Sequence, residues 1–182
     1  MGFFTLYYLI IFPRIQPVKI YCIVGYILDL EVMVLKEMTI TSSAFMDGGR
    51  IPAKYTCDGD NVNPPLDVKG IPEETKSLVL IVDDPDCPTG TWDHWIVWNI
   101  PRKGKIEEDS VPGTEGMNDF RKQSYGGPCP PPGTHRYFFK VYALDKKLGL
   151  GLEQSARKND VERSMKGHII AEGQLVGLYS RR

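Results

Sequence analysis

The stretch Asp83-Asp84-Pro85-Asp86-Cys87-Pro88, followed closely by Trp92-Asp93-His94-Trp95, decides how this chain of 182 residues is interpreted. The apolar run Ser77–Asp83 (SLVLIVD) leads into it and is bounded by turn residues. Such a continuous run is expected of a strand buried on both faces, and Trp95–Ile100 (WIVWNI) has the same character. The sequence therefore predicts two core strands joined by an acidic loop that its prolines stiffen.

Short apolar runs between scattered glycines and prolines continue along the chain, which is typical of an all-β sandwich or barrel. We expect a first strand over Thr39–Phe45, with a turn at Gly48-Gly49 after it. Thr134–Leu144 is the longest strand candidate because it is rich in aromatic and β-branched residues. Leu175–Tyr179 is expected to be the closing strand.

One helix is indicated near the C-terminal end. Asn159 is the expected N-cap, with Glu162 at the third helical position. Val161, Met165 and Ile169 fall at helical spacing on one face. Residues 101–133 hold many glycines and prolines without periodicity, and a loop of that length inside a domain is usually functional.

The bulk composition favours a globular protein that does not bind nucleic acid. Apolar residues make up 42% of the chain, and 22 basic residues stand against 23 acidic ones, for a net charge of −1. This balance leaves no basic footprint for nucleic acid and no polybasic segment for an anionic membrane. We expect a cytoplasmic protein with one domain over residues 38–182.

Residues 1–37 differ from the rest. They are strongly apolar, but charged residues and prolines interrupt them too often for a membrane-spanning helix, and a signal peptide fits poorly. Three interpretations stay open: an additional structural element, a membrane-proximal anchor, or a true start at Met33 or Met38. We favour the last.

Four cysteines, at positions 22, 57, 87 and 129, form no CxxC pair. Free buried thiols are the favoured interpretation. A Cys57–Cys129 or Cys57–Cys87 bridge stays open, because spacing alone cannot fix a disulfide connectivity.

His94 and His135 each stand near the start of a predicted strand, just after a turn-rich loop. Two imidazoles that face one cavity can donate hydrogen bonds to an anionic oxygen, and a carboxylate such as Asp84 can fix the tautomer of a histidine. Backbone N–H groups of Gly126 and Gly127, and a hydroxyl of Tyr125 or Tyr137, are further candidate donors. The simpler alternatives are that Asp-Pro-Asp is only a turn and that His168 is structural.

The order of DPDxP, WxHW and GxHRY motifs resembles the phosphatidylethanolamine-binding protein family, closest to its bacterial and archaeal, Raf-kinase-inhibitor-like branch. The likeness runs from Met38 to Tyr179 and includes Phe45–Pro65, Asn118–Phe120 and Tyr125–Pro132. The sequence departs from the family at Asp93, where many eukaryotic members carry a histidine, and at Cys87, where alanine is commoner. We expect no counterpart after Tyr179 of the C-terminal helix that flanks the pocket in eukaryotic members.

This resemblance implies a mostly β fold of two antiparallel sheets with Greek-key-like connections and one or two short helices. It also implies a cis Cys87–Pro88 peptide bond and a small anion pocket formed by Asp84, Asp86, Pro88, Trp92, His94, Gly126, His135 and Tyr137.

We therefore expect a binding protein without catalytic residues, cofactor or metal. Its expected ligands are phosphate-like groups of a small molecule, nucleotide, phospholipid headgroup or phosphorylated side chain. A protein partner such as a kinase, or a second copy of the chain, is a further expectation. The alternative is a hydrolase or metal-dependent enzyme that uses the same histidines and aspartates, and a third hypothesis is an interaction protein whose pocket is vestigial.

Overall fold

A computed structural model describes residues 35–149 and 155–181 of the chain. The interpretations of residues 1–34 lie outside the described residues. The described elements are β1 (Lys36–Glu37), β2 (Thr39–Thr41), β3 (Gly49–Arg50), the 3₁₀ helix η1 (Ala53–Tyr55), β4 (Leu66–Lys69), β5 (Ser77–Asp84), β6 (Trp92–Ile100), β7 (Lys105–Ile106), β8 (Thr114–Glu115), β9 (His135–Leu144), α1 (Lys158–Met165) and β10 (Ile169–Tyr179).

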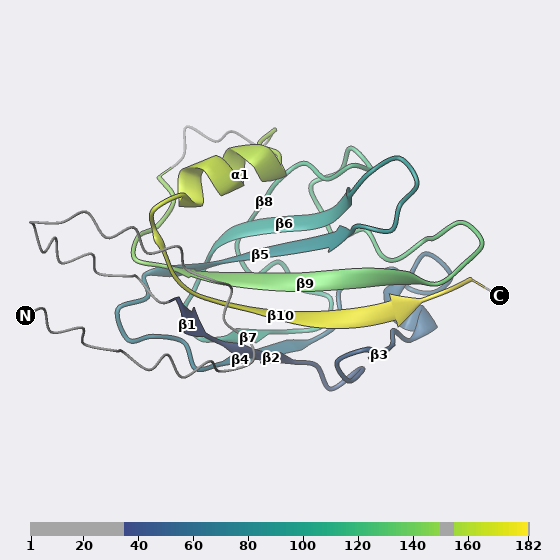
Figure 1. The fold of residues 1–182 in the computed structure, drawn as a ribbon, viewed down its shortest axis with the longest axis horizontal. Helices are drawn as coiled ribbons and strands as arrows, with labels where there is room; N and C mark the ends of the chain where they lie inside the picture. Colours follow the sequence, from purple (N-terminus) through teal and green to yellow (C-terminus); the bar gives the residue numbers. More distant parts are fainter. Residues whose placement is uncertain (1–34, 150–154, 182) are drawn as a thin grey trace, which may run out of the picture. The chain divides into compact units, whose positions relative to one another are not determined.

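The strands form two sheets, which confirms the predicted mostly β architecture. The large sheet has the order β1-β10-β9-β5-β6-β8, with β3 also paired to β10, and the small sheet has the order β2-β4-β7. In Figure 1, α1 lies on one side of the large sheet and β2, β4 and β7 lie on the other. β1 and β3 run parallel to β10, so two residues of the expected 1–37 extension belong to the large sheet.

Strand β5 is buried along its whole length, as its apolar run predicts. Leu78, Leu80 and Val82 pack into the core that the small sheet covers, whereas Val79 and Ile81 pack into the core under α1. This alternation follows from the two-residue period of a strand. The middle strand of the fold thus has an apolar layer on each face.

Several predicted boundaries are wrong by a few residues. β2 ends at Thr41 instead of Phe45, because the Ser42 hydroxyl donates to the Pro65 carbonyl at 2.7 Å and accepts the Ala44 N–H at 3.1 Å, which turns the chain. β6 begins at Trp92, three residues before the predicted Trp95.

Helix α1 begins two residues earlier than the sequence suggests. Arg157 is the N-cap, and its N–H donates to the carboxylate of Asp160, not of Glu162, at 3.1 Å. Val161 and Met165 are buried, as predicted. Ile169 belongs to β10 instead of the helix, because the chain leaves the helix through Gly167 at a φ of 78°, which glycine adopts readily.

Cys57 and Cys129 form a disulfide across 72 residues of sequence, so the preference for free thiols is wrong for this pair. The Cys57 N–H donates to the Pro128 carbonyl at 3.1 Å, which holds the two segments side by side. Cys87 is a free thiol, and Cys22 lies outside the described residues.

A buried charge cluster ties α1 to the large sheet. The fully buried Asp83 accepts from Lys140 at 2.8 Å and from Lys158 at 2.7 Å, and Lys158 also reaches Asp93 at 3.0 Å. Burial acts to lower the pKa of Lys158, but Asp83 and Asp93 together raise it above its ordinary value. Lys158 is therefore a cation throughout the neutral range.

Within the described residues, no helix has the length and apolar character needed to cross a membrane.

We expect Lys158→Met to lower the free energy of unfolding by about 3 kcal/mol, because it leaves the Asp83 carboxylate with one cation fewer in a buried site. Urea denaturation of the full chain measures this change. Lys36→Met is the matched control, since Lys36 pairs with Glu74 where the side chains are 62% and 51% exposed. Equal effects of the two substitutions would contradict the buried-cluster account.

Removal of the disulfide in a Cys57→Ser/Cys129→Ser variant is expected to lower the free energy of unfolding by roughly 2–5 kcal/mol, because the unfolded chain gains freedom. Cys87→Ser is the control and should change stability little. Peptide mapping without reductant should recover residues 57 and 129 in one cross-linked product and residue 87 as an alkylated thiol. Alkylation of Cys57 in the folded, unreduced protein would refute the pairing.

Candidate functional site

The two predicted histidines line one small cavity, together with the aspartate proposed to accompany them. His94 comes from β6, His135 from the first position of β9, and Asp84 from the last position of β5. The cavity has a volume of about 190 Å³ and is lined by Asp84, Cys87, Trp92, His94, Phe120, Cys129, Pro130, Pro131, His135 and Tyr137. Three strand ends and two distant loops thus converge on one point.

Strand alternation places His135, Tyr137 and Asp84 on the cavity side of the sheet. His135 and Tyr137 are two residues apart on β9 and share a face with the core residue Phe139. Asp84 follows Asp83 on β5, so its side chain leaves the strand on the face opposite to the α1 charge cluster.

A β-bulge turns His94 toward the same side. In the β5–β6 pairing, Trp95 is opposite Val82 and Asp93 is opposite Asp83, so His94 is an extra residue between the two pairs. Asp93 faces α1, where it binds Lys158, and Trp95 faces the core covered by the small sheet. The irregularity therefore lets His94 share the face of Trp95, in line with the use of bulges to re-aim side chains at functional sites.

Asp84 fixes the orientation of His135. Its Oδ2 lies 2.7 Å from Nδ1 of His135, and its Oδ1 accepts the Asp86 N–H at 2.8 Å. The two side chains are only 8% and 5% exposed. Because a carboxylate only accepts, Nδ1 carries the proton, and Nε2 is the ring nitrogen that a ligand can reach.

His94 is held in a similar way by the backbone. Its Nδ1 lies 2.6 Å from the Gly126 carbonyl, and its ring makes edge contacts with Phe120 and Tyr137 at centroid distances of 5.2 Å. Asn118 fixes the strand at this point by donating to the His94 carbonyl at 3.1 Å. Burial lowers the pKa of His94 below its ordinary value of 6.5, so the ring is neutral at pH 7.

Tyr137 supplies a hydroxyl with no partner among the described residues. The side chain is fully buried, and its oxygen has no hydrogen bond to any part of the chain that the structure describes. Burial, and then the charge of Asp84, raise the pKa of Tyr137, so the hydroxyl keeps its proton at neutral pH. An unsatisfied buried hydroxyl in a cavity wall is costly unless an occupant completes it.

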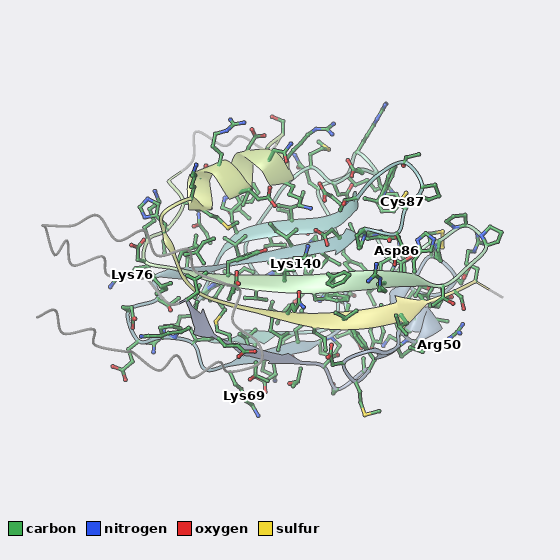
Figure 2. All side chains as sticks on the ribbon, viewed as in Figure 1. Arg50, Lys69, Lys76, Asp86, Cys87 and Lys140 are labelled. Atoms are coloured by element: carbon green, nitrogen blue, oxygen red, sulfur yellow. A yellow bond between two sulfur atoms is a disulfide. The ribbon has the colours of Figure 1, made fainter. Side chains whose placement is uncertain are left out.

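Three predicted site residues lie outside the cavity lining. Asp86 binds Arg136, with side-chain contacts of 2.6 and 2.9 Å, and this pairing lowers the pKa of Asp86 to about 2. Figure 2 shows Asp86 beside Cys87 at the end of the sheet far from Lys76. Pro88 is exposed in the same loop. Gly126 lies behind His94 as its hydrogen-bond acceptor.

The expected backbone donors are already used. The Gly126 N–H donates to the His94 carbonyl at 3.1 Å, and the Gly127 N–H donates to Asn61 Oδ1 at 2.8 Å. The Tyr125 hydroxyl donates to the Tyr55 carbonyl at 2.9 Å, away from the cavity. The expectation that these groups meet an anion is therefore wrong.

The expected cis Cys87–Pro88 bond is also wrong, because every peptide bond in the described ranges is trans. Asp86 is anchored to Arg136 on one side of this bond, and the Gly90 N–H donates to the Cys87 carbonyl at 3.0 Å on the other. These contacts hold the loop in a turn with a trans bond.

Five residues of the cavity wall are not among the predicted site residues, namely Cys87, Phe120, Cys129, Pro130 and Pro131. The last four come from the 101–133 segment, so its predicted functional role has a structural counterpart. The only sequence feature that pointed to them was the family resemblance of the segments Asn118–Phe120 and Tyr125–Pro132. Trp92 lines the cavity as expected, whereas Trp95 and Trp98 are core residues.

Within residues 35–149 and 155–181, no group of three or more His, Cys, Asp or Glu side chains is arranged to hold a metal ion. The chemistry present is that of two imidazoles, a phenol, a carboxylate and a thiol.

Comparison with known proteins places these features in a family. The model of the family described as phosphatidylethanolamine-binding protein matches residues 41–180. A UPF0098 protein of Methanothermobacter thermautotrophicus is 49% identical over 152 residues, which cover 79% of this chain and 99% of that protein. A UPF0098 protein of Chlamydia trachomatis is 42% identical over 151 residues, with the same coverage of 79% and 99%.

Solved structures agree with this match. The crystal structure of a putative phosphatidylethanolamine-binding protein homologue, CT736 of Chlamydia trachomatis, has a TM-score of 0.77 at 41% identity, covering 81% of this chain and 99% of that one. The structure of E. coli YbcL, described as a member of the mammalian family, has a TM-score of 0.73 at 29% identity, covering 80% and 99%. From the match of sequence, fold and motif order, the chain belongs to the phosphatidylethanolamine-binding protein family.

Proposed function

We propose that the cavity binds a phosphate-type anionic group and that the protein acts as a binding protein. The observation that carries this proposal is the Tyr137 hydroxyl, which is buried without a partner in the same cavity as the free Nε2 atoms of His94 and His135. These three polar atoms, with the Asp84 carboxylate, stand on an otherwise largely apolar wall. This matches the usual design of a small-ligand site, in which a few polar groups fix orientation.

The size of the cavity limits what can enter it. A volume of about 190 Å³ is below the ~300 Å³ at which pockets for whole drug-sized ligands begin. The cavity therefore suits one compact polar group, with the rest of a larger ligand outside. Two hollows adjoin it: one of about 460 Å³ shares Phe120 and Cys129, and one of about 850 Å³ shares Pro130 and Pro131. A nucleotide, a lipid headgroup or a phosphorylated side chain could each extend into them.

The second candidate is a hydrolase that uses the same residues. Its support is the His135–Asp84 pair, the arrangement by which a carboxylate orients a general base. However, the neighbouring Cys87 thiol contacts the Thr89 hydroxyl at 3.3 Å and makes no hydrogen bond to either imidazole, so the described residues place no activated nucleophile beside the pair. A phosphatase and esterase screen of the purified chain separates the two functions.

A protein partner could bind through the same cavity. If the group in the cavity is a phosphorylated side chain, the partner is the protein that carries it, and the larger hollows receive the flanking residues. A second copy of the chain is a further partner under this proposal. The Cys57–Cys129 disulfide favours a compartment in which thiols are oxidised over the expected cytoplasm.

We expect His135→Ala and His94→Ala each to weaken the binding of inorganic phosphate at least tenfold, because each removes one of the three polar atoms of the cavity. Isothermal titration calorimetry at one fixed pH and ionic strength measures the effect. His168→Ala is the matched control, since His168 pairs with Asp145 outside the cavity and is partly exposed. Unchanged phosphate affinity in both cavity variants, with the folded state verified by circular dichroism, would reject the proposed function.

A further inference from the structure

The wall of the cavity provides no permanent positive charge. None of the ten lining residues is lysine or arginine, and the residues with charge or titratable groups are Asp84, His94, His135, Tyr137 and Cys87. Arg136, the cation nearest in sequence, is turned outward and pairs with Asp86. A fully deprotonated dianion would therefore meet a carboxylate and no fixed counter-charge beside side chains that are almost completely buried, which is unfavourable.

His94 adds a specific proton requirement. A carbonyl oxygen can only accept, so the 2.6 Å contact between His94 Nδ1 and the Gly126 carbonyl places the ring proton on Nδ1. In the neutral ring, Nε2 then bears a lone pair and no proton. The His94 residue is only 3% exposed. An occupant that meets Nε2 must donate a hydrogen bond to it.

The groups around His94 keep its ring neutral, so Nε2 stays a hydrogen-bond acceptor. Its strand neighbour Asp93 is bound to Lys158, and Asp83, Asp84 and Asp119 are the charged groups whose fields reach the ring. These carboxylates favour the imidazolium, but burial outweighs them and keeps the ring neutral. His135 holds its Nδ1 proton against Asp84, and this contact leaves the requirement at His94 unchanged.

From these contacts we infer that the cavity selects a phosphoryl group that carries its own proton, and that His94 Nε2 is the atom that recognises the P–OH hydrogen. This inference rests on the proposed function and narrows it. Free phosphate and phosphomonoesters satisfy the requirement, whereas a phosphodiester such as a phospholipid headgroup has no P–OH. The Tyr137 hydroxyl donates to a second phosphoryl oxygen. Nucleotides with a terminal phosphate and phosphorylated side chains are thus the favoured ligand classes, and diester headgroups are disfavoured.

The test compares four small probes by calorimetry at pH 6.0, where about half of a phosphomonoester carries a proton, since its second pKa is about 6. The probes are inorganic phosphate, methyl phosphate, dimethyl phosphate and sulfate. We expect phosphate and methyl phosphate to bind at least tenfold more tightly than dimethyl phosphate and sulfate. Sulfate controls for size and shape, because it resembles phosphate but has no proton at this pH.

A His94→Gln variant tests the assigned atom. The glutamine amide can rotate to present N–H donors, so the ratio of phosphate to sulfate affinity should fall toward one, whereas His168→Gln should leave the ratio unchanged. The wild-type comparison stands independently of whether the variant folds. If all four probes bind wild type equally, the proton requirement is wrong while the anion site stands. If none binds, the proposed function fails and this inference fails with it.

Discussion

Two adjacent carboxylates at the end of a buried strand impose the main constraint on this structure. Asp83 and Asp84 leave β5 on opposite faces, and both are almost completely buried. A buried carboxylate needs compensating partners. Asp83 has Lys140 and Lys158, the second of which attaches α1 to one face of the sheet, and Asp84 has His135, which lines the cavity on the other. The placement of the helix and the orientation of the site thus depend on the same two residues.

The site owes its shape to a departure from strand regularity. Without the bulge, the alternation seen at Ile96 and Trp98 would direct His94 toward α1. The extra residue turns it instead toward His135 and Tyr137. Both imidazoles then present Nε2, because Nδ1 of each is bound to an acceptor that belongs to the fold. The scaffold therefore sets the hydrogen-bonding character of the cavity before any ligand arrives.

Much of this arrangement could be predicted from the sequence, and the limits have physical causes. Continuous apolar runs identified β5 and β6. The motif order identified the family, and through it five residues of the cavity: Asp84, Trp92, His94, His135 and Tyr137. The roles of Gly126 and Gly127 were misjudged because freedom from a Cβ says nothing about which acceptor an N–H will find. Asp86 was placed in the pocket because the sequence does not show that Arg136 pairs with it. The disulfide and the wall formed by Phe120 and Pro130 depend on how a long irregular loop folds back, which no periodicity encodes.

The disulfide between Cys57 and Cys129 makes the cavity depend on redox conditions as well as on its polar groups. Cys129 is part of the wall, so the position of that wall is set by a bond that exists only where thiols are oxidised. Protein handled with a reducing agent and protein handled without one therefore differ in how this wall is held. The oxidation state of the sample belongs among the conditions that define any affinity measured for it.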